Sequence, residues 1–402
     1  MRPFASTISL AEARARLAAG VRPVTRTERI PLADAAGRVA AADLVSALSV
    51  PPFARSAMDG YAVVAANTAG ATRETPVRLR ILERIFSGDL PKETLTDGSC
   101  AEIATGAPLP AGADAVVMVE DTAPIDETHV AVLAPVKPTQ NTARRGADIS
   151  PGDIVVRKGD LLNPSRVGAV AAIGHQDVEV YARPRVAILS TGNEVVEPGK
   201  PLAGAQIYDV NRFTLGAVIA AHGGLAEPGP PVADTLDALD EALRGGKDAD
   251  IVIFSGGSSV GDRDLLVDLV ARRGEMIFHG IAVKPGKPTA FATVDGRPLF
   301  GMPGNPTSCL SNAYILLVPF LRATARLPIY APRTVRASLG KKIVSPAGRH
   351  QFYTVRLVDG AAFPAFKGSG DITSLSQADG YIEIPADQST IDEGAVVDVT
   401  LF

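Results

Sequence analysis

The chain has 402 residues, of which 46% are hydrophobic and 21% are charged, and its formal net charge is −4. This length predicts two to four domains at roughly 150 residues each, and the slightly negative charge gives no electrostatic case for binding nucleic acid or an anionic membrane. Because Cys100 and Cys309 form no CxxC pair and no apolar run approaches the ~18 residues of a membrane helix, we expect a cytoplasmic protein without disulfides, structural zinc or a membrane partner.

Two short helices are predicted near the N-terminus. Residues 6–19 carry apolar side chains at helical spacing behind a serine that can cap the first turn, either Ser6 or Ser9. Residues 31–44 are predicted to form a second short helix, broken near Gly37.

A β-rich insertion is predicted next. From Val50 to about Pro151, short runs of Val, Ile and Leu are interrupted by Gly, Asp and Pro, which is typical of strands in a small β domain. Residues 163–174 are again helical, with Asn163 as the cap and Pro164 in the first turn.

From Arg183 to about Leu327 the pattern alternates between strands and helices. Strands are expected at 185–191, 250–257, 276–283, 290–294 and 298–302, and helices at 211–223, 235–245, 262–274 and 305–327. This alternation predicts a doubly wound α/β domain. Past Pro328 the β-type runs resume, so we expect a separate C-terminal β domain.

Three glycine-rich turns stand at the ends of β-type runs in the α/β segment. They read SGGSSVGDRD at 255–264, KPGKP at 284–288 and GMPGNP at 301–306. Strands of an open parallel sheet bring such turns together at the carboxyl edge, where ligands bind. Glycine lets the backbone approach a ligand, and N–H groups at a helix start attract anions. We therefore expect one site that binds phosphate.

The charged residues of these turns indicate a metal as well. Lys284 and Lys287 favour an anion, whereas Asp262 and Asp264 suit a hard cation such as Mg²⁺ shared with phosphate oxygens. The alternatives are two surface lysines and an acidic first turn that complements a helix dipole. KPGKP is not a Walker A sequence, because Pro288 occupies the place of the metal-binding Ser or Thr.

Five further positions are candidates outside these turns. Asp59 in SAMDGY, Thr105 in TGAP and Asp148 in RRGADI fit either ordinary surface turns or exposed binding groups. Glu194 in STGNE follows a buried strand and is suited to bind a metal, to accept a hydrogen bond from a ribose hydroxyl or to cap a helix. Ser369 in KGSGD fits a phosphate contact or a turn.

Together these segments resemble the molybdopterin molybdenumtransferase family, which includes bacterial MoeA and the E domain of gephyrin. The motifs occur in the order PPFARSAMDGYAV, ATGAPLPAGADAVVMVEDT, RRGADI, STGNE, QIYDVNR, SGGSSVGDRD, KPGKP and GMPGNP. Each motif alone is weak evidence, but the probability that all eight occur in this order by chance is very small.

The resemblance implies a four-domain protomer in a homodimer. The implied parts are a linking domain at 21–47 and 152–180, an inserted β-rich domain at 48–151, an α/β molybdopterin-binding domain at 1–20 and 181–327, and a C-terminal β domain at 328–402. The α/β domain is expected to be similar to the molybdopterin adenylyltransferase. The family's cleft lies between this domain of one protomer and the inserted β domain of the other.

The implied reaction inserts molybdate into adenylylated molybdopterin, with Mg²⁺ as cofactor and release of AMP. By motif, the catalytic positions are Asp59, Thr105, Glu194 and Asp264, and the metal ligands are Glu194 and Asp264. The substrate-binding positions are Asp148, Ser255, Gly256, Gly257, Ser259, Lys284, Lys287, Pro303, Gly304, Asn305, Pro306 and Ser369. Asp234 and Arg349 match less closely. Transient contacts with the adenylyltransferase and with cofactor-accepting molybdoenzymes are also implied.

Two departures from the family pattern and two rival functions stay open. Ser258 stands where Val or Thr is frequent, and Asn193 stands where Asp is frequent, which weakens a metal contact if that Asp is a ligand. The chain is alternatively the adenylyltransferase itself, although that enzyme is usually a lone α/β domain. The other rival is a non-catalytic scaffold of gephyrin's receptor-clustering type, against which the acidic site residues argue.

Overall fold

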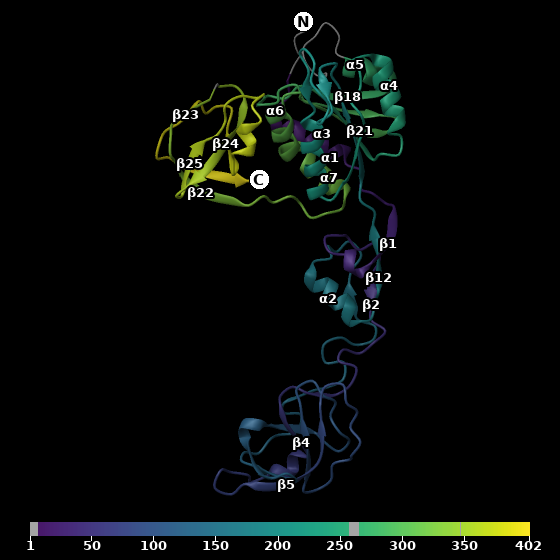
Figure 1. Ribbon diagram of the computed structural model, residues 1–402, viewed down its shortest axis with the longest axis vertical. Helices are drawn as coiled ribbons and strands as arrows, with labels where there is room; N and C mark the ends of the chain where they lie inside the picture. The colour runs from purple at the N-terminus through teal and green to yellow at the C-terminus, as the bar shows by residue number, and fades with distance from the viewer. Residues whose placement is uncertain (1–6, 257–264, 346) are drawn as a thin grey trace. The chain divides into compact units, whose positions relative to one another are not determined.

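The computed structural model describes residues 7–256, 265–345 and 347–402. The chain forms two compact units (Figure 1). We call them unit 1, made of Met1–Glu28, Gly37–Val39 and Val180–Phe402, and unit 2, made of Arg29–Ala36 and Ala40–Glu179. The division into four domains at the residues given above stays a prediction.

Unit 1 contains a six-stranded sheet with the order β16-β13-β17-β21-β20-β18. Its strands are β16 (Leu225–Pro228), β13 (Arg185–Ser190), β17 (Ile251–Ser255), β21 (Arg297–Met302), β20 (Ala290–Val294) and β18 (Gly274–His279). The first four strands are parallel to one another, whereas β20 and β18 run antiparallel to their neighbours.

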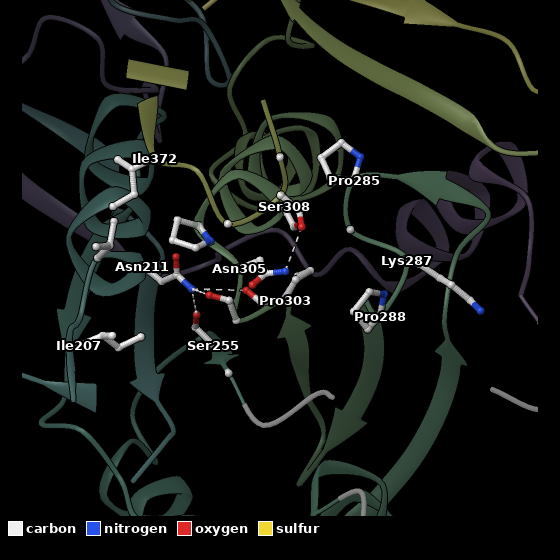
Figure 2. Close-up of a pocket in the computed structure, with 18 of the residues that line it drawn as sticks. Ile207, Asn211, Ser255, Pro285, Lys287, Pro288, Pro303, Asn305, Ser308 and Ile372 are labelled. Carbon is white, nitrogen blue, oxygen red and sulfur yellow. Dashed lines mark hydrogen bonds between the residues drawn. The ribbon is translucent and has the colours of Figure 1, made fainter. Parts of the chain in front are cut away.

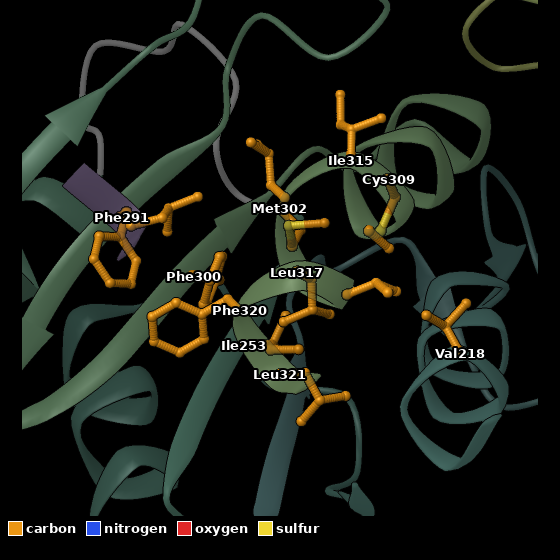
Figure 3. Close-up of a cluster of buried hydrophobic side chains, with 14 of the residues drawn as sticks. Val218, Ile253, Phe291, Phe300, Met302, Cys309, Ile315, Leu317, Phe320 and Leu321 are labelled. Atoms are coloured by element: carbon orange, nitrogen blue, oxygen red, sulfur yellow. The ribbon is translucent and has the colours of Figure 1, made fainter. Parts of the chain in front are cut away.

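Helices cover both faces of this sheet, because its central strands are apolar on both sides. Along β17, Ile251 and Ile253 pack on one side, and Val252 and Phe254 pack on the other. The first side is covered by α1 (Leu10–Gly20), α3 (Asn211–Ala221), α6 (Pro306–Asn312) and α7 (Val318–Thr324), and the second by α4 (Leu236–Gly245) and α5 (Leu265–Arg273). Figure 3 shows side chains of α3, α6 and α7 in the first cluster. Ser9 caps α1 through Glu12 N–H. The predicted doubly wound α/β fold is confirmed.

The expectation that strands of one parallel sheet bring all three glycine-rich turns together is wrong for the turn at Lys284, because that turn follows β19 (Val283–Lys284), a strand of another sheet. β20 and β21 are joined by Asp295 and Gly296, whose φ angles of 50° and 76° form a tight Asp-Gly hairpin turn. This hairpin makes the far edge of the sheet antiparallel. The predicted strand 276–283 is also divided, into β18 and β19.

β19 belongs to the C-terminal sheet, although it comes from the α/β segment. The sheet has the order β19-β24-β25-β22-β28-β26, and β24 also pairs with β26, so that the sheet closes on itself. Its other strands are β24 (His350–Val358), β25 (Ala361–Pro364), β22 (Thr334–Leu339), β28 (Val396–Leu401) and β26 (Gly380–Ile384), with the short helix α8 (Thr373–Ser376) beside them. The expected C-terminal β region is confirmed.

The single helix predicted over 305–327 is divided. Between α6 and α7 lies a π-helical segment, η4, at Ala313–Leu317. Pro319 stands in the first turn of α7 and has no N–H to continue the α-helical hydrogen bonds of the preceding turn. The helical direction is kept, but its hydrogen-bond pattern changes.

Unit 2 contains the predicted β-rich region. Its sheet has the order β7-β4-β6-β5-β9-β8, formed by β7 (Ala115–Met118), β4 (Gly60–Val63), β6 (Ser99–Ile103), β5 (Val77–Ile85), β9 (His129–Val132) and β8 (Thr122–Asp126). Val63 and Val117 pack into one core cluster, and Ala62 and Val116 pack into another. The expected helix at 163–174 is α2 (Pro164–Ala172), capped by Asn163.

The predicted helix over 31–44 is wrong. After a three-residue 3₁₀ turn at Leu32–Asp34, the backbone bonds to distant segments: Ala40 N–H donates to the Asp160 carbonyl, and Ala41 N–H to the Glu179 carbonyl. These tertiary hydrogen bonds override the local helical preference of the alanines. Across the described residues, every helix is too short or too polar to reach through a bilayer.

Candidate functional site

A cavity of about 1070 Å³ opens in unit 1 (Figure 2). The ends of β13, β17 and β21, the turn after β19 and a loop of the C-terminal region form its walls. Among the predicted site residues, those lining it are Glu194, Ser255, Gly256, Lys284, Lys287, Pro303, Gly304, Asn305, Pro306 and Ser369. Gly257, Ser259 and Asp264 lie outside the described residues, as does Asp262.

The ends of β13 and β17 meet closely on one wall. Thr191 N–H donates to the Ser255 carbonyl at 2.8 Å. Gly256 has a φ of 103°, and a Cβ there would lie 2.2 Å from the Thr191 carbonyl oxygen. Only glycine fits this close approach, which is the role that the sequence indicated. Glu194 follows on the same wall with an exposed side chain.

Asn211, at the start of α3, joins two of the glycine-rich turns. Its Nδ2 donates to Ser255 Oγ at 2.8 Å and to the Gly304 carbonyl at 2.9 Å, with a longer contact of 3.4 Å to the Pro303 carbonyl (Figure 2). The side chain is 7% exposed. The first turn of α3 is held by Asp209, whose Oδ1 accepts from Arg212 N–H.

The GMPGNP turn leads into α6, with Asn305 preceding the helix and Pro306 in its first turn. Asn305 Nδ2 donates to Ser369 Oγ at 3.1 Å. Thr307 adds two bonds to the same loop, from its N–H to the Ser369 carbonyl and from its Oγ1 to the Asp371 carbonyl. The C-terminal KGSGD loop is therefore attached to the start of α6.

The opposite wall carries the positive charge. Lys284 ends β19 and Lys287 lies on the turn that follows, and the pairing of Val283 with His350 in β24 places Arg349 at the neighbouring strand end. Lys367 is the fourth cation that lines the cavity. Among the lining residues that the structure describes, the carboxylates are Glu194 and Asp209, so this part of the lining carries more positive than negative charge. Such a wall suits an oxyanion or a phosphate group.

The charges of two carboxylates, Asp234 and Glu194, influence each other near the end of β13. Burial raises the pKa of Asp234, a backbone hydrogen bond at Asn193 opposes the rise, and the negative charge of Glu194 adds to it. Asp234 Oδ1 is buried and has no hydrogen-bond partner among the described residues. Such a pair fits a cation. Within the described ranges, no three His, Cys, Asp or Glu side chains are grouped to hold a metal ion.

Cys309 is buried in α6 and is unsuited to act as a nucleophile. Its side chain is 0% exposed, and burial raises the pKa of the thiol to about 12. Its Sγ lies 3.9 Å from Ser255 Oγ. At neutral pH the thiolate form that attacks electrophiles is therefore nearly absent.

The remaining predicted residues belong to unit 2. Asp59 and Thr105 are adjacent there, because Thr105 N–H donates to Asp59 Oδ1 at 2.7 Å. A Cβ at Gly60 would lie 1.9 Å from the Val117 carbonyl oxygen, so the residue after Asp59 has to be glycine. Asp148 is exposed, and its N–H donates to the Val50 carbonyl.

Sequence reasoning underrated three residues of the site. Arg349 was a weak match, and its place at the start of β24, next to β19, follows from a strand pairing that no local pattern reveals. Lys367 precedes the KGSGD serine and was read only as part of that turn. Asn211 entered only as the first residue of the helix expected at 211–223, although a polar residue at the start of an apolar helical run was a usable signal.

Comparisons with known proteins agree with this architecture. Three family descriptions match the chain: "MoeA N-terminal region (domain I and II)" at residues 8–174, "Probable molybdopterin binding domain" at 187–323, and "MoeA C-terminal region (domain IV)" at 336–402. Two crystal structures of a molybdopterin biosynthesis MoeA protein from Pyrococcus horikoshii give TM-scores of 0.84 and 0.83 at 37% and 32% identity, and each covers at least 98% of both chains.

Curated relatives match over nearly the whole length. The chain is 36% identical over 393 residues to molybdopterin molybdenumtransferase 2 of Mycobacterium tuberculosis, which covers 94% of this chain and 95% of that protein. It is 35% identical over 315 residues to the molybdopterin molybdenumtransferase of Haemophilus influenzae, covering 78% and 77%. The chain therefore belongs to the molybdopterin molybdenumtransferase family.

Proposed function

We propose that this chain inserts molybdate into adenylylated molybdopterin during molybdenum cofactor biosynthesis and releases AMP. The observation that carries the proposal is the convergence of two glycine-rich strand ends and four cations on one cavity of about 1070 Å³. A pocket of this size holds a nucleotide-sized ligand. The names of the relatives support the substrate class.

The residues of unit 1 act mainly by positioning and charge neutralisation. Lys284, Lys287 and Arg349 neutralise the oxyanion and the phosphates, while Gly256 and Gly304 let the substrate approach the backbone. Fixed cations and N–H groups stabilise charge on phosphate oxygens without reorganisation, which is how phosphoryl chemistry is usually accelerated.

Asp59, Thr105 and Asp148 take part from a partner protomer in this proposal, which requires a homodimer. A mixture of Asp59→Ala and Lys287→Ala subunits tests the arrangement. If each site combines unit 1 of one protomer with unit 2 of the other, every mixed dimer regains one intact site, and an equal mixture recovers about a quarter of wild-type activity. An inactive mixture contradicts a shared site.

Mg²⁺ is part of the proposal, with Glu194, Asp234 and Asp264 as the residues that would hold it. The repulsion between Glu194 and Asp234 and the buried Asp234 oxygen, which has no hydrogen-bond partner among the described residues, support a cation here. Bound Mg²⁺ would neutralise charge on the phosphate oxygens. Because ionised Asp234 is disfavoured in the fold, Mg²⁺ at pH 7 is expected to raise the melting temperature of wild type more than that of Asp234→Asn. Equal shifts contradict the assignment.

The deciding experiment measures AMP release from adenylylated molybdopterin by the purified chain, with and without molybdate. We expect release to depend on molybdate and to fall in Lys287→Ala. ATP-dependent adenylylation of molybdopterin by this chain alone would favour the adenylyltransferase. Failure to restore molybdoenzyme activity in a strain that lacks the insertase would favour a scaffold.

The same proposal includes a cytoplasmic location and transient contacts with the adenylyltransferase and the molybdoenzymes that accept the product. A reactive intermediate is best protected when it passes directly between proteins. Cross-linking the purified chain to a purified adenylyltransferase, with and without its product bound, tests the first contact.

A further inference from the structure

Two buried side chains hold the turn that carries Lys284 and Lys287. Asn312 Nδ2 donates to the Gly286 carbonyl at 2.9 Å and also to Thr289 Oγ1. Thr289 Oγ1 in turn donates to the same Gly286 carbonyl at 2.9 Å. Both side chains are 0% exposed. Gly286, between the two lysines, is therefore fixed by one donor from α6 and one from the residue that precedes β20.

The fit between Gly286 and Asn312 is tight. Gly286 has a φ of 101°, and a Cβ there would lie 2.2 Å from Asn312 Nδ2. Glycine is required both by this backbone conformation and by the nearness of the amide. The path of the turn is consequently determined by where the Asn312 side chain stands.

Asn312 is an unfavourable residue for its location apart from this contact. Its Oδ1 is buried without a hydrogen-bond partner in the part of the chain that the structure describes, and its neighbours Ala313, Ile315 and Leu316 are buried and apolar. An unsatisfied buried oxygen destabilises a fold. The π-helical segment Ala313–Leu317 begins directly after it, and such segments are frequent at functional sites.

We propose that Asn312 is a positioning residue of the oxyanion site. It does not line the cavity, and it acts by holding the Gly286 carbonyl and so the direction of Lys284 and Lys287. This inference rests on the proposed function of the cavity. It extends the set of residues that determine oxyanion affinity to one that touches no ligand.

Removing the amide is expected to weaken oxyanion binding more than turnover. In Asn312→Ala the KM for molybdate should rise about 10- to 100-fold, because displacements near 1 Å in a binding group have effects of this size. The kcat at saturating molybdate should change little. Asn312→Asp keeps the shape but removes the donor, so it should show the same rise in KM.

A double-mutant cycle separates positioning from a general loss of stability. Gly286→Ala alone forces its methyl group against Asn312 Nδ2, and Asn312→Ala removes that clash. The two changes should therefore be coupled, with the double variant binding molybdate better than the product of the single losses. Additive losses would overturn the proposal.

Thr324→Val is the matched control. Thr324 is 2% exposed, and its Oγ1 donates to the Phe320 carbonyl, so the variant also loses a buried hydrogen bond, but one away from the cavity lining. It should leave the KM for molybdate unchanged. A rise in KM equal to that of Asn312→Ala would mean that any loss of stability has this effect, and would overturn the proposal.

Equilibrium dialysis with inorganic molybdate distinguishes a failure of the positioning role of Asn312 from a failure of the proposed function. If wild type binds molybdate and Asn312→Ala binds it equally well, Asn312 has no positioning role, but the proposed function stands. If wild type neither binds molybdate nor releases AMP in its presence, the proposed function fails together with this inference. Binding by wild type that is weakened in Asn312→Ala and kept in Thr324→Val is the expected result.

Discussion

Replacing Asn211 by alanine tests how the site is assembled. The Asn211 amide lies 2.8 Å from Ser255 Oγ and 2.9 Å from the Gly304 carbonyl oxygen, and it is 7% exposed. The change removes two hydrogen bonds, each contributing roughly 0.5–1.5 kcal/mol, and leaves the buried Ser255 Oγ without this donor. Together these losses amount to about 2–4 kcal/mol in the free energy of unfolding of unit 1.

The assay is thermal unfolding followed by circular dichroism, together with the KM for molybdate. At roughly 2–4 °C per kcal/mol for a body of this size, the melting temperature of Asn211→Ala should fall by about 5–15 °C. The KM for molybdate should rise because the turns at Ser255 and Gly304 lose the side chain that hydrogen-bonds to both of them. Asn211→Asp, which turns a carboxylate toward carbonyl oxygens, should be destabilised at least as much.

Thr235→Ala is the control for helix stability. Thr235 caps α4 through Ala238 N–H, and losing such a cap costs about 1 kcal/mol without touching the cavity. It should melt slightly earlier than wild type and keep its KM. An Asn211→Ala protein that melts within about 1 °C of wild type and binds molybdate normally would refute the view that this amide joins the two turns.

Three other predictions concern separate groups. Asp59→Ala should lower AMP release by about 100-fold or more with little change in melting temperature, since the carboxylate is exposed; normal turnover would exclude it from the reaction. Burial disfavours ionised Asp250, but hydrogen bonds from Arg26 and from Arg185 N–H outweigh it and lower the pKa. Ionised Asp250 therefore stabilises the fold above about pH 4, and this stabilisation is lost as the pH falls through the lowered pKa. The urea midpoints of unfolding of wild type and Asp250→Asn should differ most at pH 7 and converge in acid. Iodoacetamide at pH 8 should alkylate Cys309 only after unfolding, and rapid labelling of the native chain would contradict its burial.

The alternation of strands and helices could be predicted because each element carries its own local signal. The run at 250–255 is apolar on both faces, which is what a strand between two helical layers requires. The Asp295–Gly296 hairpin was also readable, since an Asp-Gly pair between two apolar runs is a strong turn signal. It was missed because the runs were assigned to a parallel sheet.

Tertiary hydrogen bonds explain what local patterns could not predict. The alanines of 31–44 favour a helix when considered alone, but their backbone groups bond to strands and loops far along the chain. Likewise, nothing in the residues of β19 indicates that Val283 pairs with His350. Arg349 reaches the cavity only through that pairing, so the sequence alone ranked it below the two lysines.

For the site, the sequence indicated which residues would come together better than it indicated what each residue does. The turns at Ser255 and Gly304 were expected to meet, and both line one cavity in the structure. The means by which they meet is the Asn211 amide, whose sequence context fits a helix cap equally well. A helix cap and a link between two loops both require a small polar side chain, so only the three-dimensional structure distinguishes them.

The placement of β19 has a consequence for exchanging parts between relatives. Val283 and Lys284 belong to the α/β part of the chain but complete the sheet of the C-terminal part. A chimera joined near residue 328 would thus pair this two-residue strand with a β24 strand from another protein. The surroundings of Lys284 would change although Lys284 itself was not replaced. In such hybrids, the affinity for the oxyanion should depend more on how well the two parental sequences fit together where β19 pairs with β24 than on which relative supplied either half.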